Sequence, residues 1–410
     1  MLLTPHPTWS VTDSSKLEEF ETCPRKYFFR YRYGWTPDRP SLDLVHGEAW
    51  HEGKRQLYLA KGKTGSYNDG FEAAIAEYLK CYAKYYGEEE WSWNSPKNPD
   101  GARLGFSTFI EENDEDVFKL IGAEIHGTVP VSEKYVLVAK LDTLIETNEG
   151  IMVIDHKTSK NSLSEIFIDE YQMKLQFNTY SLMGLVYCLS MGYKPGDFQG
   201  VLINHAAFKE SKKLGKTVEC TRFSIKKTVD QLEQYMQEAE QLIELIEWND
   251  ATLRKDRDDE LVMLAFPRRT QSCTKYFRRC EYYDMCRYFT NPLRFLDKPQ
   301  AGFHVEWWDP RKVEGRQREF LKFKGLKKEG TNASVRGDQP RQEDRVDEDS
   351  KEVVESTLAV SRLRVRSRSG YQDIRQLGRR HGRRLGCPRA PRRRRIFTGG
   401  VSGLRHGRRK

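Results

Sequence analysis

Two carboxylates near the middle of the chain have the spacing of a site for hydrolysis. They lie in two strand-like runs, 135–145 and 151–157, which flank the sequence TNEG at 147–150. Because Asn and Gly tolerate positive φ, this sequence predicts a tight turn. If the turn centres in the middle of that range, Asp142 lies opposite Asp155, with their Cβ atoms about 5 Å apart.

A lysine two residues after the second carboxylate completes the group. Side chains alternate along a strand, so Lys157 projects on the same face as Asp155. Two carboxylates this close stay ionised only beside a cation, and Mg²⁺ prefers carboxylate oxygens. A bound metal would stabilise the charge of a phosphoryl-transfer transition state, while the lysine would orient or deprotonate the attacking water. The arrangement therefore indicates metal-assisted phosphodiester hydrolysis.

The acid-x-Lys triplet has little value by itself. The first 350 residues hold 57 acidic and 50 basic residues, so chance alone produces such a triplet about eight times. Its weight comes from the hairpin register that brings Asp142 beside it, and from the apolar run 151–154 that leads into it. Glu124, in the strand before the hairpin, is a further candidate for the same site. A solvent-facing hairpin at a sheet edge is the alternative that the pattern leaves open.

The motif Asp142…Asp155-His156-Lys157 resembles that of the PD-(D/E)XK nuclease superfamily. The resemblance implies a restriction-endonuclease-like α/β fold, with a mixed β-sheet core flanked by helices. It also implies that both acids and the carbonyl of His156 bind Mg²⁺ or Mn²⁺, and that Lys157 positions the water. The implied activity is that of a deoxyribonuclease, an exonuclease acting in DNA recombination, repair or phage DNA processing.

Two flanking motifs are similar to those of the RecB/AddB-like branch, which includes CRISPR-associated and phage-type nucleases. Gly47-x-x-x-His51 resembles its GxxxH helix, whose histidine is a further metal ligand. Gln176-x-x-x-Tyr180 resembles its QxxxY helix, which orients the DNA strand. Taken alone, His51 is an ordinary histidine. Gln176 and Tyr180 share one helix face, with Gln172 one turn earlier. Taken alone, a Gln–Tyr pair at this spacing is typical of an ordinary helix surface.

Four cysteines from opposite ends of the chain form a candidate cluster site. Cys273, Cys280 and Cys286 are spaced C-x6-C-x5-C, and Cys23 lies in the segment 14–27. Four thiolates suit a [4Fe-4S] cluster or tetrahedral zinc, and the spacing does not choose between them. The segment 14–27 is similar to the start of the iron–sulfur members of this branch, which carry one cysteine before the nuclease core and three after it. The resemblance thus implies a [4Fe-4S] staple, although the x6 interval after Cys273 departs from the x2 of many members.

The remaining cysteines and the basic segments have simpler explanations. Cys81, Cys188 and Cys220 are expected to be buried core thiols. Buried free thiols are also the alternative to a cluster for Cys23, Cys273, Cys280 and Cys286. The segments 25–33 and 275–279 mix basic with aromatic residues, a composition that suits a DNA single strand. Because half of a helical segment faces the core, only their arginines and lysines are expected to contact DNA.

The chain divides into a folded body and a basic tail. Residues 1–300 are expected to form one nuclease domain, residues 301–350 a charged linker, and residues 351–410, with Cys387, a disordered Arg-rich tail. Strands are expected over the hairpin and over 199–208. Helical periodicity predicts helices over 14–33, 71–86, 172–189 and 229–248.

The net charge of +9 comes from the tail, which holds 19 of the 69 Lys and Arg residues but only 3 of the 60 acids. The first 350 residues therefore carry a net charge of −7, and overall basicity is no evidence that they bind nucleic acid. A basic arm on nucleic acid, a solvated tail and an out-of-frame extension all fit the composition of the tail.

Several protein classes are excluded. No apolar run approaches the roughly 18 residues of a membrane helix, and the N-terminus lacks the features of an export signal. Eight cysteines in such a chain do not indicate a disulfide scaffold. A cytoplasmic protein of a bacterium or a phage-infected host is expected. The segment 61–65 resembles a P-loop, but Leu57 stands where the first glycine is required, so the chain is not itself a helicase.

The expected partner is DNA, as single strands or DNA ends, with a helicase or recombination protein acting in trans. Two alternatives belong to other classes: a non-catalytic iron–sulfur module that binds nucleic acid beside a helicase, and a zinc-stapled structural protein. The intact set of Asp142, Asp155 and Lys157 favours the nuclease, because an idle relative has no physical reason to keep clustered like charges.

Overall fold

The structure is a computed structural model that describes residues 4–132, 134–275, 278–295 and 298–310, with the backbone of three short strands beyond them. These strands are β11 (Lys312–Val313), β12 (Arg316–Gln317) and β13 (Leu321–Lys322). The tail 351–410, with Cys387, and most of the predicted linker lie outside the described residues, so both remain predictions.

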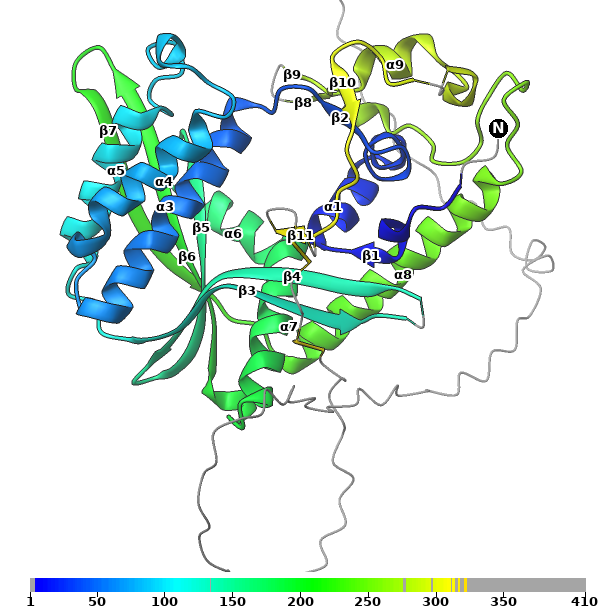
Figure 1. The fold of residues 1–410 in the computed structure, drawn as a ribbon. Helices are drawn as coiled ribbons and strands as arrows, with labels where there is room; N and C mark the ends of the chain where they lie inside the picture. Colours follow the sequence, from blue (N-terminus) through cyan, green and yellow to red (C-terminus); the bar gives the residue numbers. More distant parts are fainter. Residues whose placement is uncertain are drawn as a thin grey trace, which may run out of the picture. The chain divides into compact units, whose positions relative to one another are not determined.

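A mixed β-sheet forms the centre of the fold, in the order β13-β3-β4-β5-β6-β7 (Figure 1). Neighbouring strands are antiparallel except for the parallel pairs β13/β3 and β5/β6, and β1 runs parallel to β4. The parallel pair β5/β6 needs a crossover connection, which α6 (Glu165–Met173) and α7 (Leu175–Ser190) provide. The strands are β1 (Val11–Thr12), β3 (Lys119–Pro130), β4 (Val136–Thr147), β5 (Gly150–Ser159), β6 (Phe198–Ser211) and β7 (Gly215–Ile225).

Helices cover both faces of this sheet (Figure 1). One face packs against α3, α4 and α5, and the other against α1, α7 and α8. Side chains of β5 alternate between the two cores: Val153 joins the core with α7 and α8, and Ile154 the core with α3 to α5. The helices are α1 (Ser14–Thr22), α2 (Pro24–Tyr27), α3 (Leu42–Thr64), α4 (Phe71–Tyr82), α5 (Pro99–Asn113), α6 (Glu165–Met173), α7 (Leu175–Ser190), α8 (Val229–Leu253) and α9 (Tyr283–Tyr288).

The mixed α/β architecture is confirmed, but two predicted helices are broken. Cys23 has an extended backbone (φ −161°), so α1 ends there and α2 begins at Pro24, where a missing N–H costs nothing. Lys174, with ψ 135°, separates α6 from α7. Gln172 therefore lies on a different helix from Gln176, and the prediction that they share one was wrong.

Helix α3 packs closely on α5 because both carry glycine at the contact. A Cβ on Gly53 would overlap the ring of Phe106, and a Cβ on Gly105 would lie 3.0 Å from the ring of Trp50. The P-loop-like segment 61–65 forms the end of α3, where Gly65 closes the helix at φ +86°. Its backbone N–H groups donate within the helix and are not free to bind a phosphate, which agrees with the rejection of a P-loop. Within the described residues no helix is long and apolar enough to cross a membrane.

Acid is expected to destabilise the protein through His46 of α3. Its side chain is buried, and its Nδ1 lies 2.7 Å from the hydroxyl of Tyr78. Burial lowers the pKa of His46 to about 3, so the unfolded chain binds this proton at a higher pH than the folded one. The contribution of neutral His46 to the free energy of unfolding is therefore fully present above about pH 6.5. Below that pH it falls by up to about 1.4 kcal/mol for each pH unit.

Urea unfolding at pH 7.5, 6.5 and 5.5 measures this slope. The variant His46→Phe cannot take up the proton, so its free energy of unfolding is expected to fall less steeply with acid than that of the wild type. Equal slopes for the two proteins would contradict this role of His46.

Candidate active site

The predicted hairpin forms with the predicted register. Strands β4 and β5 pair from Thr147↔Gly150 to Thr143↔Ile154, and both lie inside the sheet, which excludes an edge hairpin. Beyond the last pair the ladder stops, because β4 continues along β3 while β5 continues along β6 (Figure 1). The next residues on the two strands are Asp142 and Asp155. The candidate carboxylates therefore lie where two central strands separate.

Asp142 is held by groups on two other elements. Its Oδ2 lies 2.9 Å from Nδ1 of His51, on α3, and accepts a hydrogen bond of 3.1 Å from the backbone N–H of His156. Burial opposes ionisation of this carboxyl, but the charge and hydrogen bond of His51, together with the charges of His156 and Lys157, hold the pKa of Asp142 below its ordinary value. Asp142 is thus an ionised, buried carboxylate.

Asp155 is completely buried and lies beside the predicted lysine. Lys157 donates to its Oδ1 at 2.8 Å, and the lysine side chain is 20% exposed. Burial raises the pKa of Asp155 to about 6; Lys157 opposes this effect and Asp142 adds to it. Asp155 therefore binds a proton more readily than Asp142 does. The site reaches solvent at the partly exposed side chain of Lys157.

The Gln–Tyr pair of α7 points at the same carboxylate. Gln176 Nε2 lies 3.5 Å from Asp155 Oδ1 and donates to the hydroxyl of Tyr180 at 3.1 Å. The backbone N–H of Gln176 donates to Glu18 of α1 at 3.2 Å. Glu18 was not predicted from the sequence, since nothing in its segment indicates that α1 reaches the first turn of α7.

Glu124 also lies at the site. The β3–β4 pairs Ala123↔Thr143 and Ile125↔Leu141 flank it, so it stands across from Asp142. Its φ of +57° is unusual for a strand residue other than glycine, and such strain is found at functional sites. Its carboxylate pairs with Lys140 at 2.5 Å, an ion pair that was not predicted.

The side chain of His156 makes no hydrogen bond to either carboxylate. Its ring is buried 5.4 Å from that of Tyr58 and 5.8 Å from that of His51, and neither ring nitrogen has a hydrogen-bond partner among the described residues. The metal role expected for His156 needs only its main-chain carbonyl, and this geometry is consistent with that expectation.

The donor set fits a hard divalent cation. Two carboxylates and a carbonyl supply oxygen, and His51 adds one nitrogen, a combination that suits Mg²⁺ or Mn²⁺. In the described residues, His, Cys, Asp and Glu side chains nowhere gather in threes in a ready metal geometry. At this site the hydrogen bond of His51 and the ammonium of Lys157 supply the positive charge instead. Binding a cation would require both to turn aside from the carboxylates.

The four candidate cluster cysteines lie on segments that pack together. Cys23 is buried between α1 and α2, while Cys280 follows a short hairpin of β8 (Thr274–Lys275) and β9 (Arg278–Arg279). The N–H of Cys280 donates to the carbonyl of Cys273 at 2.9 Å. The thiol of Cys286, on α9, interacts electrostatically with those of Cys23 and Cys273. All four are free cysteines.

Further contacts join these N- and C-terminal segments. Lys26 pairs with Glu281 at 3.0 Å, and the ring of Tyr282 stacks on Phe29 at 5.3 Å. Strand β2 (Trp35–Pro37) pairs with β10 (Phe303–Val305). Burial raises the pKa of Cys280 to about 12, so a thiolate there needs a compensating cation such as a metal.

Two arginines that were expected to contact DNA are internal instead. Arg25 is buried and donates to the carbonyl of Phe266 at 2.8 Å. Arg32 is fully buried in a two-pronged pair with Asp250, at 2.7 and 2.8 Å. Both join the N-terminal segment to the region after α7, so the prediction was wrong for these two. Among the cysteines expected in the core, Cys81 and Cys188 are buried and Cys220 is half-buried.

Known proteins share this sequence pattern. The model of the PD-(D/E)XK nuclease superfamily matches residues 9–287, a range that contains the whole candidate site. No curated protein is a significant match. A solved structure from Eubacterium rectale, described as a "Putative exonuclease", is similar at 12% identity and a TM-score of 0.33, over 62% of this chain and 87% of that chain; a likeness this distant carries no argument about function. The family match covers well over half of the sequence, and the chain belongs to the PD-(D/E)XK nuclease superfamily.

Proposed function

We propose that the protein is a Mg²⁺- or Mn²⁺-dependent deoxyribonuclease of the RecB/AddB-like iron–sulfur branch, acting as an exonuclease in DNA recombination, repair or phage DNA processing. The observation that carries the proposal is the meeting of Asp142, Asp155 and Lys157 where β4 and β5 separate. Family membership supports nuclease chemistry. The flanking motifs and the cysteines support the branch.

Each residue has a role that follows from its position. His51, Asp142, Asp155 and the carbonyl of His156 would hold the ion, which when bound supplies positive charge to the scissile phosphate. Lys157 can donate a hydrogen bond to the attacking water or to a phosphate oxygen, because its ammonium is partly exposed beside Asp155.

The cysteines complete the proposal. Cys23, Cys273, Cys280 and Cys286 would hold a [4Fe-4S] cluster, and the packing of their segments supports this assignment. Hydrolysis needs no redox step, so the cluster would be a structural staple. The body of the chain carries a net negative charge, which makes a helicase or recombination partner a reasonable source of further DNA contacts.

Tyr180→Phe is expected to lower the rate of cleavage about 10-fold to 100-fold, the usual effect of losing a partner that orients a metal ligand. The hydroxyl accepts the hydrogen bond that holds Gln176 toward Asp155. Single-turnover cleavage of labelled DNA measures the effect. Tyr187→Phe, on the same helix, is the control and should cleave at the wild-type rate. Equal rates for all three proteins would remove Tyr180 from the site.

The proposed function is tested with four DNA substrates: linear and closed circular, each single- and double-stranded. Each is incubated with Mg²⁺, Mn²⁺ or EDTA. An exonuclease degrades the linear forms, leaves the circles intact and stops in EDTA. Cleavage of the circles would correct the proposal to an endonuclease. No cleavage by a folded protein that contains iron would favour the non-catalytic binding module.

A further inference from the structure

A cavity of about 230 Å³ lies between helices α3 and α5 and strands β6 and β7. It does not include Asp142, Asp155 or Lys157 in its walls. The apolar part of its lining comes from Trp50, Phe109 and Ala206, which belong to the core shared with α3 to α5. The cavity is therefore separate from the candidate active site.

The main polar group of the cavity is a buried lysine. Lys54 is 1% exposed, and its Nζ has no hydrogen-bond acceptor among the described residues. The ammonium lies over the ring of Phe109, with the rings of Tyr58 and Trp50 at 5.5 and 5.9 Å. Aromatic faces attract a cation, but they offset only part of the several kcal/mol that burial of an unpaired charge costs. Burial lowers the pKa of Lys54 well below its ordinary value.

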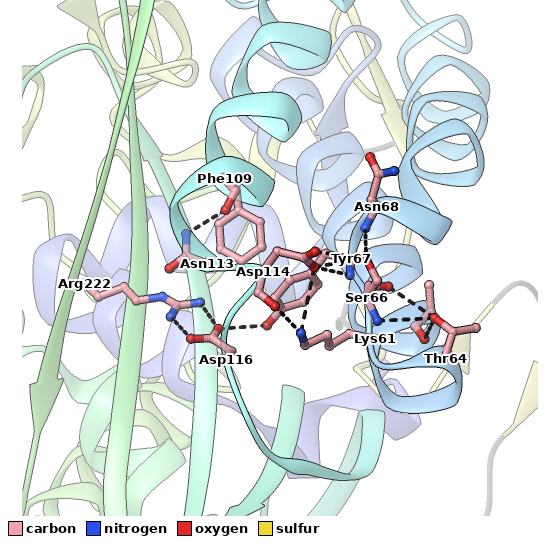
Figure 2. A network of polar contacts seen from close by, with 11 residues as sticks. Lys61, Thr64, Ser66, Tyr67, Asn68, Phe109, Asn113, Asp114, Asp116 and Arg222 are labelled. Atoms are coloured by element: carbon pink, nitrogen blue, oxygen red, sulfur yellow. Dashed lines mark hydrogen bonds and ion pairs between the residues drawn. The ribbon is translucent and has the colours of Figure 1, made fainter.

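Asp116, an acid beside the cavity, is already paired with Arg222, as Figure 2 shows. Arg222 donates to both carboxylate oxygens of Asp116 at 2.9 and 2.7 Å. Its Nε donates to the side-chain oxygen of Asn204 at 2.8 Å. Asp116 also accepts a hydrogen bond from Tyr67. Arg222 and Asp116 thus neutralise each other. The acid in the lining itself, Glu112, is exposed at the rim.

Two buried polar atoms of the cavity lining have no hydrogen-bond partner among the described residues. Besides Lys54, His205 lines it with an Nδ1 that has no partner in the described part of the chain, while its Nε2 lies 2.9 Å from the hydroxyl of Ser159. The Ser159 hydroxyl donates its proton to the carbonyl of Asn161, so Nε2 donates to Ser159, and Nδ1 is left as an acceptor for a hydroxyl of the ligand. The unpaired amine of Lys54 and this acceptor together favour an oxyanion that carries a hydroxyl, and such an anion would hold the amine in its charged form.

We propose that this cavity is a binding site for a small oxyanion of the phosphate class, with Lys54 as its main anchor. Its volume is below the roughly 300 Å³ at which pockets for drug-sized ligands begin, so it excludes a DNA strand and admits free phosphate or the phosphate end of a small molecule. The proposal does not depend on nuclease activity.

Phosphate-dependent thermal unfolding of the full chain tests the proposal, with calorimetric titration alongside. Inorganic phosphate should raise the melting temperature of the wild type, because a ligand that binds only the folded state stabilises it. Lys54→Met should abolish this response. Glu112→Gln removes the negative charge at the rim and should strengthen it. Lys63→Met, at an exposed position of the same helix, is the matched control and should respond as the wild type does.

A wild type that does not respond to phosphate would overturn the proposal, as would an undiminished response in Lys54→Met, which would indicate surface binding. If Lys54→Met fails to fold, Glu112→Gln decides, and an unchanged affinity there would contradict the site. A competition arm with dAMP distinguishes the sources: displacement of phosphate by dAMP, but not by deoxyadenosine, identifies a nucleotide phosphate as a ligand.

Discussion

Replacing Asp155 with asparagine is expected to reduce DNA cleavage by on the order of 10³-fold or more. The amide keeps the shape of the side chain but removes one of the two carboxylates that would hold the metal beside the scissile phosphate. The fold should survive, because burial already raises the pKa of Asp155 to about 6, so a neutral group at this position suits the protein without metal. DNA affinity should change little.

Two measurements separate this result from unfolding. Single-turnover cleavage reports the chemical step, and fluorescence anisotropy with labelled DNA in EDTA reports binding. Asp169→Asn, at an exposed position of α6, is the control and should cleave as the wild type does. A folded Asp155→Asn protein that cleaves DNA at the wild-type rate would remove Asp155 from the active site.

If the proposed cluster is present, replacing Cys280 with serine is expected to remove it and to lower the free energy of unfolding by several kcal/mol, the scale of structural metal sites. Without the proposed cluster, the segment of Cys280 would be held on the N-terminal segments by contacts such as Lys26–Glu281 and Phe29–Tyr282. Iron per chain, visible absorbance and denaturant unfolding measure the loss.

The control for this variant is Cys81→Ser, a buried thiol on α4 that should leave iron content unchanged. A Cys280→Ser protein that retains its iron and its stability would exclude Cys280 as a ligand. A colourless wild type that contains zinc would replace the proposed iron–sulfur cluster with a zinc staple.

The hairpin was predictable because its local signals agree. The alternation of apolar residues fixes which face each side chain takes, and the turn at 147–150 sets the register, so the pairing of Thr143 with Ile154 follows. That β4 and β5 part directly after this pair could not be predicted. Their separation depends on the neighbouring strands β3 and β6, which are distant in sequence.

Helices α3 and α5 have weak periodicity for physical reasons. The buried face of α3 includes His46, Lys54 and Lys61, which a hydrophobic pattern counts as surface. The buried face of α5 includes Gly101 and Gly105, which lower helix propensity. Only the GxxxH resemblance indicated α3.

The candidate site was partly predictable for the same reason. Motif spacing placed Gln176 and Tyr180 on one helix face, and the structure directs Gln176 toward Asp155. Lys140 and Glu18 escaped prediction, because each reaches the site through tertiary packing rather than through a local pattern.

The central claim is that the two separated strands hold a metal that the cleavage of DNA requires. The most direct test is the cleavage rate of one end-labelled linear DNA by a single folded preparation, first in EDTA and then during titration with Mg²⁺ or Mn²⁺. The account predicts no cleavage in EDTA and a saturable recovery as metal is added. Cleavage that continues in EDTA, or no cleavage at any concentration of either metal, would contradict it.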